Sequence, residues 1–393
     1  MAPDVIKEPL MKRGLQGKWV TRTEVEAHQA FVPNALPPIP PLDLAAFAAL
    51  TERANRALGR LDGVSTMLPD TRLFLYFYVR KEAVLSSQIE GTQSSLSDLL
   101  LYETTELPGV PLEDVQEVSR YVDATERAMK LLRGGLPLSS RFIRQIHEVL
   151  LNSGRGASKQ PGAFRKQPVW LGGSSPSAAL FVPPPWSEVD RCIGQLETYL
   201  HDETAPTLIK AALVHAQFET IHPFLDGNGR LGRLLIALIL VAEQALSEPL
   251  LYLSLYFRQH RQQYYELLQG TREAGDWEAW IEFFLHGVEL TAENAHTTAR
   301  KALALFAKHE QQIREIDGPS KLSVMAVYQQ LRQRPIVDAK TLTAGAGVTP
   351  PTTLKALERL TQLGLVQEIS GRQSRRIFAY RPLLELLQND LPL

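Results

Sequence analysis

The chain has 393 residues, enough for two or three domains with buried cores. Its net charge of −1 argues against a general attraction to nucleic acid or to anionic membranes. A single cysteine, Cys192, excludes an internal disulfide framework and a cysteine-based zinc site.

The first 41 residues are predicted to be irregular, because they end in the proline-rich segment PNALPPIPP at 33–41. They begin without a continuous apolar stretch, so we expect no signal peptide. The longest apolar run, LLIALILVA at 234–242, is about half a membrane span long and predicts a buried helix instead. We therefore expect a cytoplasmic protein with no membrane partner.

Apolar residues at helical spacing predict a mainly α-helical protein. Residues 72–103 continue this pattern, with Gly91 as the expected end of the first helix. Residues 165–186 contain short β-prone runs around Gly-Gly-Ser-Ser, which predict a hairpin-like flap. The other predicted helices cover 42–60, 111–133, 139–152, 187–202, 205–219, 229–244, about 257–270 and 276–315.

The pattern changes after about residue 320. Helical stretches at 322–333, 338–345 and 352–363 precede two strand-like runs within 365–380, which together are typical of a winged-helix domain. We place a boundary near 316–320. The expected units are an N-terminal arm with the first helices at 1–110, a helical core at 111–315, and a winged helix at 320–393.

The predicted winged helix is basic in a chain that is nearly neutral. Lys355 and Arg359 are four residues apart on the third helix, and Arg372, Arg375 and Arg376 lie at the hairpin tip. A winged helix that binds DNA presents such charges to the phosphates. The alternative is a domain that binds a protein or dimerises.

The segment TIHPFLDGNGRLGRLL at 220–235 concentrates polar side chains before an apolar helix. Gly227 and Gly229 allow a ligand close to the backbone, and Asn228 can cap a helix whose free N–H groups attract anions. Arg230 and Arg233 are three residues apart, so both can hold a di- or triphosphate.

Two further residues of this segment indicate chemistry on the phosphates. Asp226 is suited to hold Mg²⁺, which favours one or two carboxylates together with phosphate oxygens. His222 could take a proton from an attacking group. The order of the residues differs from a Walker loop and from a kinase glycine loop. The alternative is that the histidine and arginines only cap a helix.

The stretch HPFLDGNGRLGR at 222–233 resembles the Fic family signature, His-x-Phe-x-(Asp/Glu)-Gly-Asn-Gly-Arg-x-x-Arg, at every specified position. RKEAVLSSQIEGTQSSLSDLL, VPPPW, HAQFETIHPF and LYLSLYFRQHRQQYYELL are also similar to long-chain Fic proteins, so the resemblance covers about residues 30–315. It implies a Fic-type helical bundle core with a small β-hairpin flap, often accompanied by a winged helix. It also implies protein adenylylation, the transfer of AMP from ATP to a protein hydroxyl with release of pyrophosphate.

The same resemblance assigns roles to individual residues. His222 would be the general base and Asp226 the Mg²⁺ ligand. The flap would lay the target protein beside the nucleotide by strand pairing. The residues of the nucleotide and target sites would be Gly227, Asn228, Gly229, Arg230, Leu231, Gly232 and Arg233 for the phosphates, and Ala178, Ala179, Leu180 and Phe181 for the target.

Tyr264 and Tyr265 resemble family positions beside the adenine, although tyrosines at helical spacing also occur in cores. Tyr252 is expected in the core. His215 lies two turns before His222, and we expect it to be packed or hydrogen-bonded.

SSQIEG at 86–91 places Ser86 and Glu90 on one helical face. It resembles the inhibitory pattern of class II Fic proteins, (Ser/Thr)-x-x-x-Glu-(Gly/Asn), in which the glutamate pairs with the second arginine of the signature, here Arg233. This carboxylate would deny the guanidinium to the γ-phosphate, so we expect low basal activity. The alternatives are a solvated surface glutamate and a glutamate that positions water to remove AMP.

Two other functions stay open at this point. The same fold could transfer UMP, phosphocholine or phosphate, or the chain could be a largely silent DNA-binding regulator. The expected partners are ATP, an unidentified target protein (including the chain itself), DNA at the winged helix, and a second copy in a homodimer.

Overall fold

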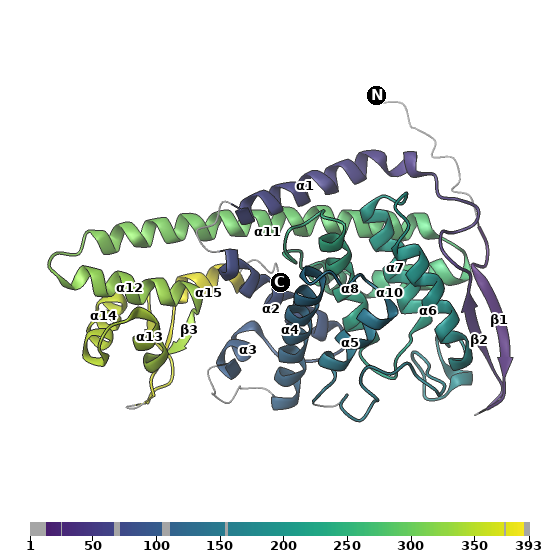
Figure 1. Ribbon diagram of the computed structural model, residues 1–393, viewed down its shortest axis with the longest axis horizontal. Helices are drawn as coiled ribbons and strands as arrows, with labels where there is room; N and C mark the ends of the chain where they lie inside the picture. The colour runs from purple at the N-terminus through teal and green to yellow at the C-terminus, as the bar shows by residue number, and fades with distance from the viewer. Residues whose placement is uncertain are drawn as a thin grey trace.

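The computed structural model describes residues 13–24, 26–66, 71–103, 111–153, 156–372 and 375–388. The fold is mainly α-helical, as the sequence predicts, and it extends along α11 (Trp277–Arg314), a single helix of 38 residues (Figure 1). α1 (Ala48–Thr66) packs along part of α11. Residues 1–12 of the predicted arm lie outside the described residues.

The core is built around α7 (Thr207–Ile221) and α8 (Asn228–Ala242), which pack against each other. α7 is buried from Leu208 to its end, and α8 is buried from Leu231 to Leu240, which confirms the predicted buried helix. Among the described helices, none combines the length and the apolarity needed to cross a lipid bilayer. The helices that surround this pair are α2 (Thr71–Ile89), α3 (Leu96–Glu103), α4 (Leu112–Arg133), α5 (Ser140–Leu150), α6 (Trp186–Leu200), α9 (Ser254–Gln259) and α10 (Arg261–Glu273).

The described part of the N-terminal arm is not irregular, contrary to the prediction. β1 (Gly17–Arg22) and β2 (His28–Pro33) form an antiparallel hairpin in which Trp19 lies opposite Phe31. The Phe31 N–H donates to the Val182 carbonyl at 2.9 Å, so the hairpin is attached to the segment that follows the flap. Two short strands gain most of their stability from such packing, which local sequence does not reveal.

The tail contains α12 (Ser320–Gln333), α13 (Ala339–Ala346), α14 (Pro350–Gln362), β4 (Gln367–Glu368) and β5 (Ile377–Ala379) in the predicted order. The sequence interpretation missed β3 (Ile336–Asp338) and α15 (Arg381–Gln388). β5 lies between β3 and β4 in an antiparallel sheet. A three-residue strand has no visible alternation, and its pairing with β5 defines it. The winged-helix assignment itself stays a prediction.

The last turns of α11 pack against the tail (Figure 1). The His309 side chain is 2.7 Å from the Tyr380 hydroxyl, which in turn lies 3.0 Å from the Tyr328 hydroxyl. Glu310 forms an ion pair with Arg332 of α12. The boundary predicted near 316–320 falls between α11 and α12, and the division into three units stays a prediction.

Trp280 provides a test of the core. Its side chain is fully buried, and its Nε1–H donates to the Ala212 carbonyl of α7 at 2.9 Å. We expect Trp280→Phe to lower the free energy of unfolding by about 2 kcal/mol, because it removes this hydrogen bond and leaves a cavity. Urea unfolding followed by circular dichroism measures the change. Trp186→Phe, at a tryptophan that is 43% exposed, should cost less than about 0.5 kcal/mol, and an equal effect of both would contradict the assignment.

Candidate active site

His222 lies where α7 ends and has a left-handed backbone, with φ 49° and ψ 61°. Pro223 follows it and prevents the helix from continuing. The buried Arg165 guanidinium donates to the His222 carbonyl at 2.8 Å and to the Ile221 carbonyl at 3.3 Å. A cation on the last carbonyls of a helix is favourable, so Arg165 fixes the direction in which the chain leaves α7.

The loop between α7 and α8 is held by Asn228 and Phe224. The Asn228 amide oxygen accepts from the Phe224 N–H, and the amide nitrogen donates to the Phe224 carbonyl, both at 2.9 Å. The Phe224 ring is fully buried and stacks on His147 with 3.6 Å between ring centroids. Gly227 takes φ 74°, which glycine adopts without strain. These contacts fix the start of α8 relative to His222.

The N-terminus of α8 forms a cradle for an anion. The first N–H groups of a helix have no partner within the helix and carry a partial positive charge. Gly229 lies here beside the Glu90 carboxylate, since a Cβ at this position would lie 2.3 Å from its Oε1. Leu231 and Gly232 form the next turn, where Leu231 is 1% exposed. The cradle is therefore made mostly of backbone.

The structure brings Glu90 and Arg233 together across 143 positions of the sequence. Glu90 Oε1 accepts from Arg233 Nη2 at 2.6 Å. The Ser86 hydroxyl accepts from Arg233 Nε, and the Ser86 carbonyl accepts from Nη2, both at 2.9 Å. Burial disfavours the charged carboxylate, but the guanidinium groups of Arg233 and Arg230 hold the pKa of Glu90 below its usual value. The pair is charged, and Glu90 occupies the fork of Arg233.

Arg230 has three acidic neighbours in the same site. Its guanidinium forms ion pairs with Glu90 at 3.2 Å, with Glu117 at 3.1 Å and with Asp226 at 3.3 Å. The Arg230 side chain is only 3% exposed. Glu117 comes from α4, and the sequence interpretation did not single it out.

Asp226 is the residue that fits a magnesium ion. Its Oδ1 accepts from the Gly227 N–H at 2.6 Å, and its side chain is 35% exposed, so the carboxylate is oriented but open to a ligand. The described residues contain no group of three His, Cys, Asp or Glu side chains that could hold a metal. A single carboxylate suits Mg²⁺, which keeps several waters and shares phosphate oxygens. The Mg²⁺ assignment stays a prediction.

The environment of His222 favours the neutral imidazole. Burial lowers its pKa to about 3, and the guanidinium groups of Arg165 and Arg272 act in the same direction. Arg272, on α10, donates to the Thr220 hydroxyl at 3.1 Å and to the Glu219 carbonyl at 3.3 Å, one turn before His222. A neutral imidazole is the form that can accept a proton.

The two tyrosines predicted beside the adenine differ in exposure. Tyr264 is 1% exposed, and its hydroxyl lies 2.8 Å from Nε2 of the buried His215. His215 is thus hydrogen-bonded, as expected. Tyr265 is 44% exposed, and the guanidinium of Arg261 lies 5.5 Å from its ring centroid. Of the pair, Tyr265 is the ring that a ligand can reach, and the adenine contact stays a prediction.

The flap is less regular than the predicted hairpin. Its two sides meet in a single β-bridge between Leu171 and Phe181, and a short 3-10 helix, η2 (Pro176–Ala178), forms its end. Ala178 and Ala179 follow the turn, and Leu180 is 82% exposed. Proline and consecutive serines at the tip favour turns over strand pairing.

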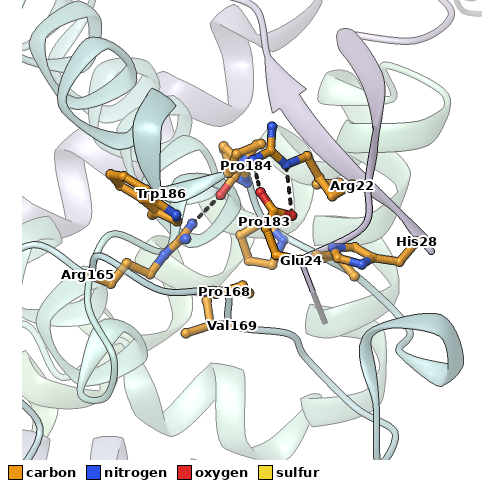
Figure 2. Close-up of a pocket in the computed structure, with 12 residues that line it drawn as sticks. Arg22, Glu24, His28, Arg165, Pro168, Val169, Pro183, Pro184 and Trp186 are labelled. Atoms are coloured by element: carbon orange, nitrogen blue, oxygen red, sulfur yellow. Dashed lines mark hydrogen bonds and ion pairs between the residues drawn. The ribbon is translucent and has the colours of Figure 1, made fainter. Parts of the chain in front are cut away.

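The flap is connected to His222 through two arginines. The Phe181 ring is buried, and the Arg272 guanidinium lies 3.9 Å from its centroid. Figure 2 shows the Arg165 guanidinium pointing to the Pro184 carbonyl, 2.6 Å away, beside the hairpin residues Arg22 and Glu24. Sequence reasoning missed both arginines, because each is a single residue outside any motif.

Comparisons with known proteins agree with this geometry. The model described as "Fic/DOC family N-terminal" matches residues 48–130, and the one described as "Fic/DOC family" matches residues 137–240. The chain carries both domains of the Fic/DOC family. The Fic domain contains His222, the cradle and both signature arginines, whereas Glu90 lies in the N-terminal domain.

Relatives with curated names are similar over part of their length. A protein of Aquifex aeolicus named "Probable protein adenylyltransferase" is 31% identical over 194 residues, which are 47% of this chain and 54% of that protein. A "Protein adenylyltransferase Fic" of Aedes aegypti is 28% identical over 257 residues, 62% of this chain and 46% of that protein. The chain thus spans about half the length of the curated relatives it matches.

Solved structures confirm the fold. A Fic family protein from Desulfovibrio desulfuricans superposes with a TM-score of 0.56 at 20% identity, covering 88% of this chain and 98% of that one. A Fic domain containing signaling protein from Bacteroides thetaiotaomicron gives a TM-score of 0.52 at 20% identity, covering 64% and 96%. The mainly helical Fic fold is therefore established for this chain.

The lowered pKa of His222 gives a pH test. We expect the His222 imidazole to stay neutral from pH 7 to about pH 5, whereas in the unfolded chain it takes up a proton near pH 6.5. Acidification through this range then favours unfolding. His222→Gln should therefore lose less stability than the parent, by at most about 1.4 kcal/mol per pH unit. A His222 NMR signal that titrates near pH 6.5, assigned with the same variant, would contradict the prediction.

Proposed function

We propose that the chain is a protein adenylyltransferase, which transfers AMP from ATP to a hydroxyl side chain of a protein. The observation that carries the proposal is the fixed placement of His222 beside the N-terminus of α8, where Arg233 is held by a removable carboxylate. The names of the Aquifex and Aedes relatives support this reaction class. The target protein is not identified by the site.

In the proposed reaction His222 takes the proton of the target hydroxyl, and the hydroxyl oxygen forms a bond to the α-phosphorus of ATP. The bond from the α-phosphorus to the bridging oxygen breaks, and pyrophosphate leaves. The N–H groups at the start of α8 stabilise the charge on the transferred group. Asp226 is the residue that would hold Mg²⁺, which supplies neutralisation of phosphate charge when bound.

We further propose that Glu90 inhibits this reaction in the resting chain. The carboxylate that lies 2.6 Å from Arg233 Nη2 occupies the position where a γ-phosphate would bind the guanidinium. ATP that binds without this contact is held in a different pose, so its α-phosphorus is not aligned with the hydroxyl. A different transferred group, or removal of AMP with water positioned by Glu90, are the other outcomes that the assay below distinguishes.

We expect Glu90→Gly to raise the transfer of label from α-labelled ATP to the chain or to lysate proteins at least about 10-fold, because it frees Arg233. γ-labelled ATP should give no protein label. Adding His222→Ala should reduce transfer by about 100-fold or more, since it removes the base. Scintillation counting of precipitated protein measures all three results.

Glu113→Gly is the control for Glu90→Gly, because it removes an exposed glutamate in the first turn of α4. It should leave transfer at the parent level. Label from the γ-phosphate would indicate phosphate transfer in place of adenylylation. No label from α-labelled ATP, even with Glu90→Gly, would rule the proposed function out, and unchanged transfer with His222→Ala would remove His222 as the base.

For the tail we propose binding to DNA. Lys355 and Arg359 are exposed on α14, and Arg372 and Arg375 are exposed between β4 and β5. These charges come from the two elements with which a winged helix contacts a duplex. The alternative, a surface for another protein, uses the same residues without dependence on DNA.

A gel-shift with random duplex DNA tests this proposal. We expect binding at about 50 mM salt that weakens at least about 10-fold at 200 mM, because phosphate contacts release counterions. Lys355→Ala/Arg359→Ala should weaken it further, and Lys301→Ala, an exposed charge on α11, should not. No shift at the lower salt concentration would contradict DNA binding.

A further inference from the structure

Glu117 is a charged residue that the proposed reaction does not use. Its side chain is 12% exposed, and its Oε1 lies 3.1 Å from Nη1 of Arg230. It comes from α4, which packs against α2 and α8. Glu117 therefore approaches the signature from a helix that carries none of the signature residues.

Arg230 meets three carboxylates at three different nitrogens. Nε lies 3.2 Å from Glu90, Nη1 lies 3.1 Å from Glu117, and Nη2 lies 3.3 Å from Asp226. A guanidinium is planar and presents its N–H groups in fixed directions. Three carboxylates around its edge therefore determine both its place and its orientation.

Arg233 is held in a different way. Glu90 is the carboxylate recorded on its guanidinium within the described part of the chain, and its remaining recorded bonds go to Ser86. If Glu90 withdraws, Arg233 loses this carboxylate, whereas Arg230 keeps Glu117 and Asp226. The two signature arginines are thus unequal once inhibition is relieved.

We propose that Glu117 is a positioning residue that keeps Arg230 in place, so that Asp226 stays open to Mg²⁺ and Arg233 takes the outer phosphates. This inference rests on the proposed adenylyltransferase function and deepens it. Without the Glu117 carboxylate, and with Glu90 withdrawn, Arg230 keeps Asp226 as its acidic partner. It then pairs more closely with the carboxylate that is to hold the metal.

The charge of the site leads to a second expectation. With all groups ionised, Glu90, Glu117 and Asp226 outweigh Arg230 and Arg233 by one negative charge. Removal of Glu90 makes the site neutral, and removal of the Glu117 charge as well makes it positive by one. Loss of Glu117 should therefore favour metal-free ATP while it weakens the metal site.

The test compares Glu90→Gly with Glu90→Gly/Glu117→Gln, both as full chains. Calorimetry with ATP in the presence of EDTA should show about 5-fold tighter binding for the double variant, because the site gains a positive charge. Mg²⁺ titrated into the protein saturated with ATP should bind about 10-fold more weakly, because Arg230 competes for Asp226.

Glu90→Gly/Glu113→Gln is the matched control, since it removes the same charge one turn earlier on α4 at an exposed position. It should change neither affinity. Glu90→Gly/Glu117→Asp keeps the charge with a shorter side chain. It should return the metal-free affinity for ATP to the Glu90→Gly value, and it serves if the glutamine variant does not fold.

Two results would overturn the proposal. In the first, both affinities of the Glu117 variants equal those of the control. In the second, the affinities for ATP and Mg²⁺ fall together, as expected if Glu117 only supports packing. These binding measurements do not depend on group transfer. Absence of label transfer by every variant would therefore contradict the proposed function without deciding the role of Glu117.

Discussion

The active site depends on one carboxylate shared by two guanidinium groups. Glu90 places one oxygen on Arg233 and the other near Arg230, and both arginines are almost completely buried. Removing one partner of a buried ion pair leaves an uncompensated charge, which is strongly unfavourable. An anion of some kind is therefore needed at Arg233 in every state of the site. In the proposed reaction that anion alternates between Glu90 and a phosphate.

The helix that carries Glu90 is firmly attached to the core. Glu82 accepts from the Ser254 N–H at the start of α9, and Arg261 of α10 donates to the Ile89 carbonyl at the end of α2. Ala83, Leu85 and Ile89 are buried at 1% exposure or less. Displacement of α2 as a whole would break all of these contacts. A local change in its last turn, next to Gly91 with φ 104°, breaks far fewer.

Much of this architecture could be predicted from the sequence, because it depends on local patterns. The spacing of apolar residues located the helices, and the signature placed His222 and the α8 cradle within twelve residues. Glu117, Arg165 and Arg272 were missed because their roles come from distant contacts with no local pattern. The β1–β2 hairpin was missed for the same reason. Helical spacing could not distinguish the buried Tyr264 from the exposed Tyr265.

α11 belongs to both halves of the molecule. Its first turns pack in the core through Trp280, and its last turns pack on the tail through His309. At about 1.5 Å per residue, the helix has a length of roughly 57 Å. A continuous helix resists bending, so it acts as a spacer of set length. Whatever the tail binds is held at a defined distance from His222, and this distance limits which partner surfaces the flap can meet.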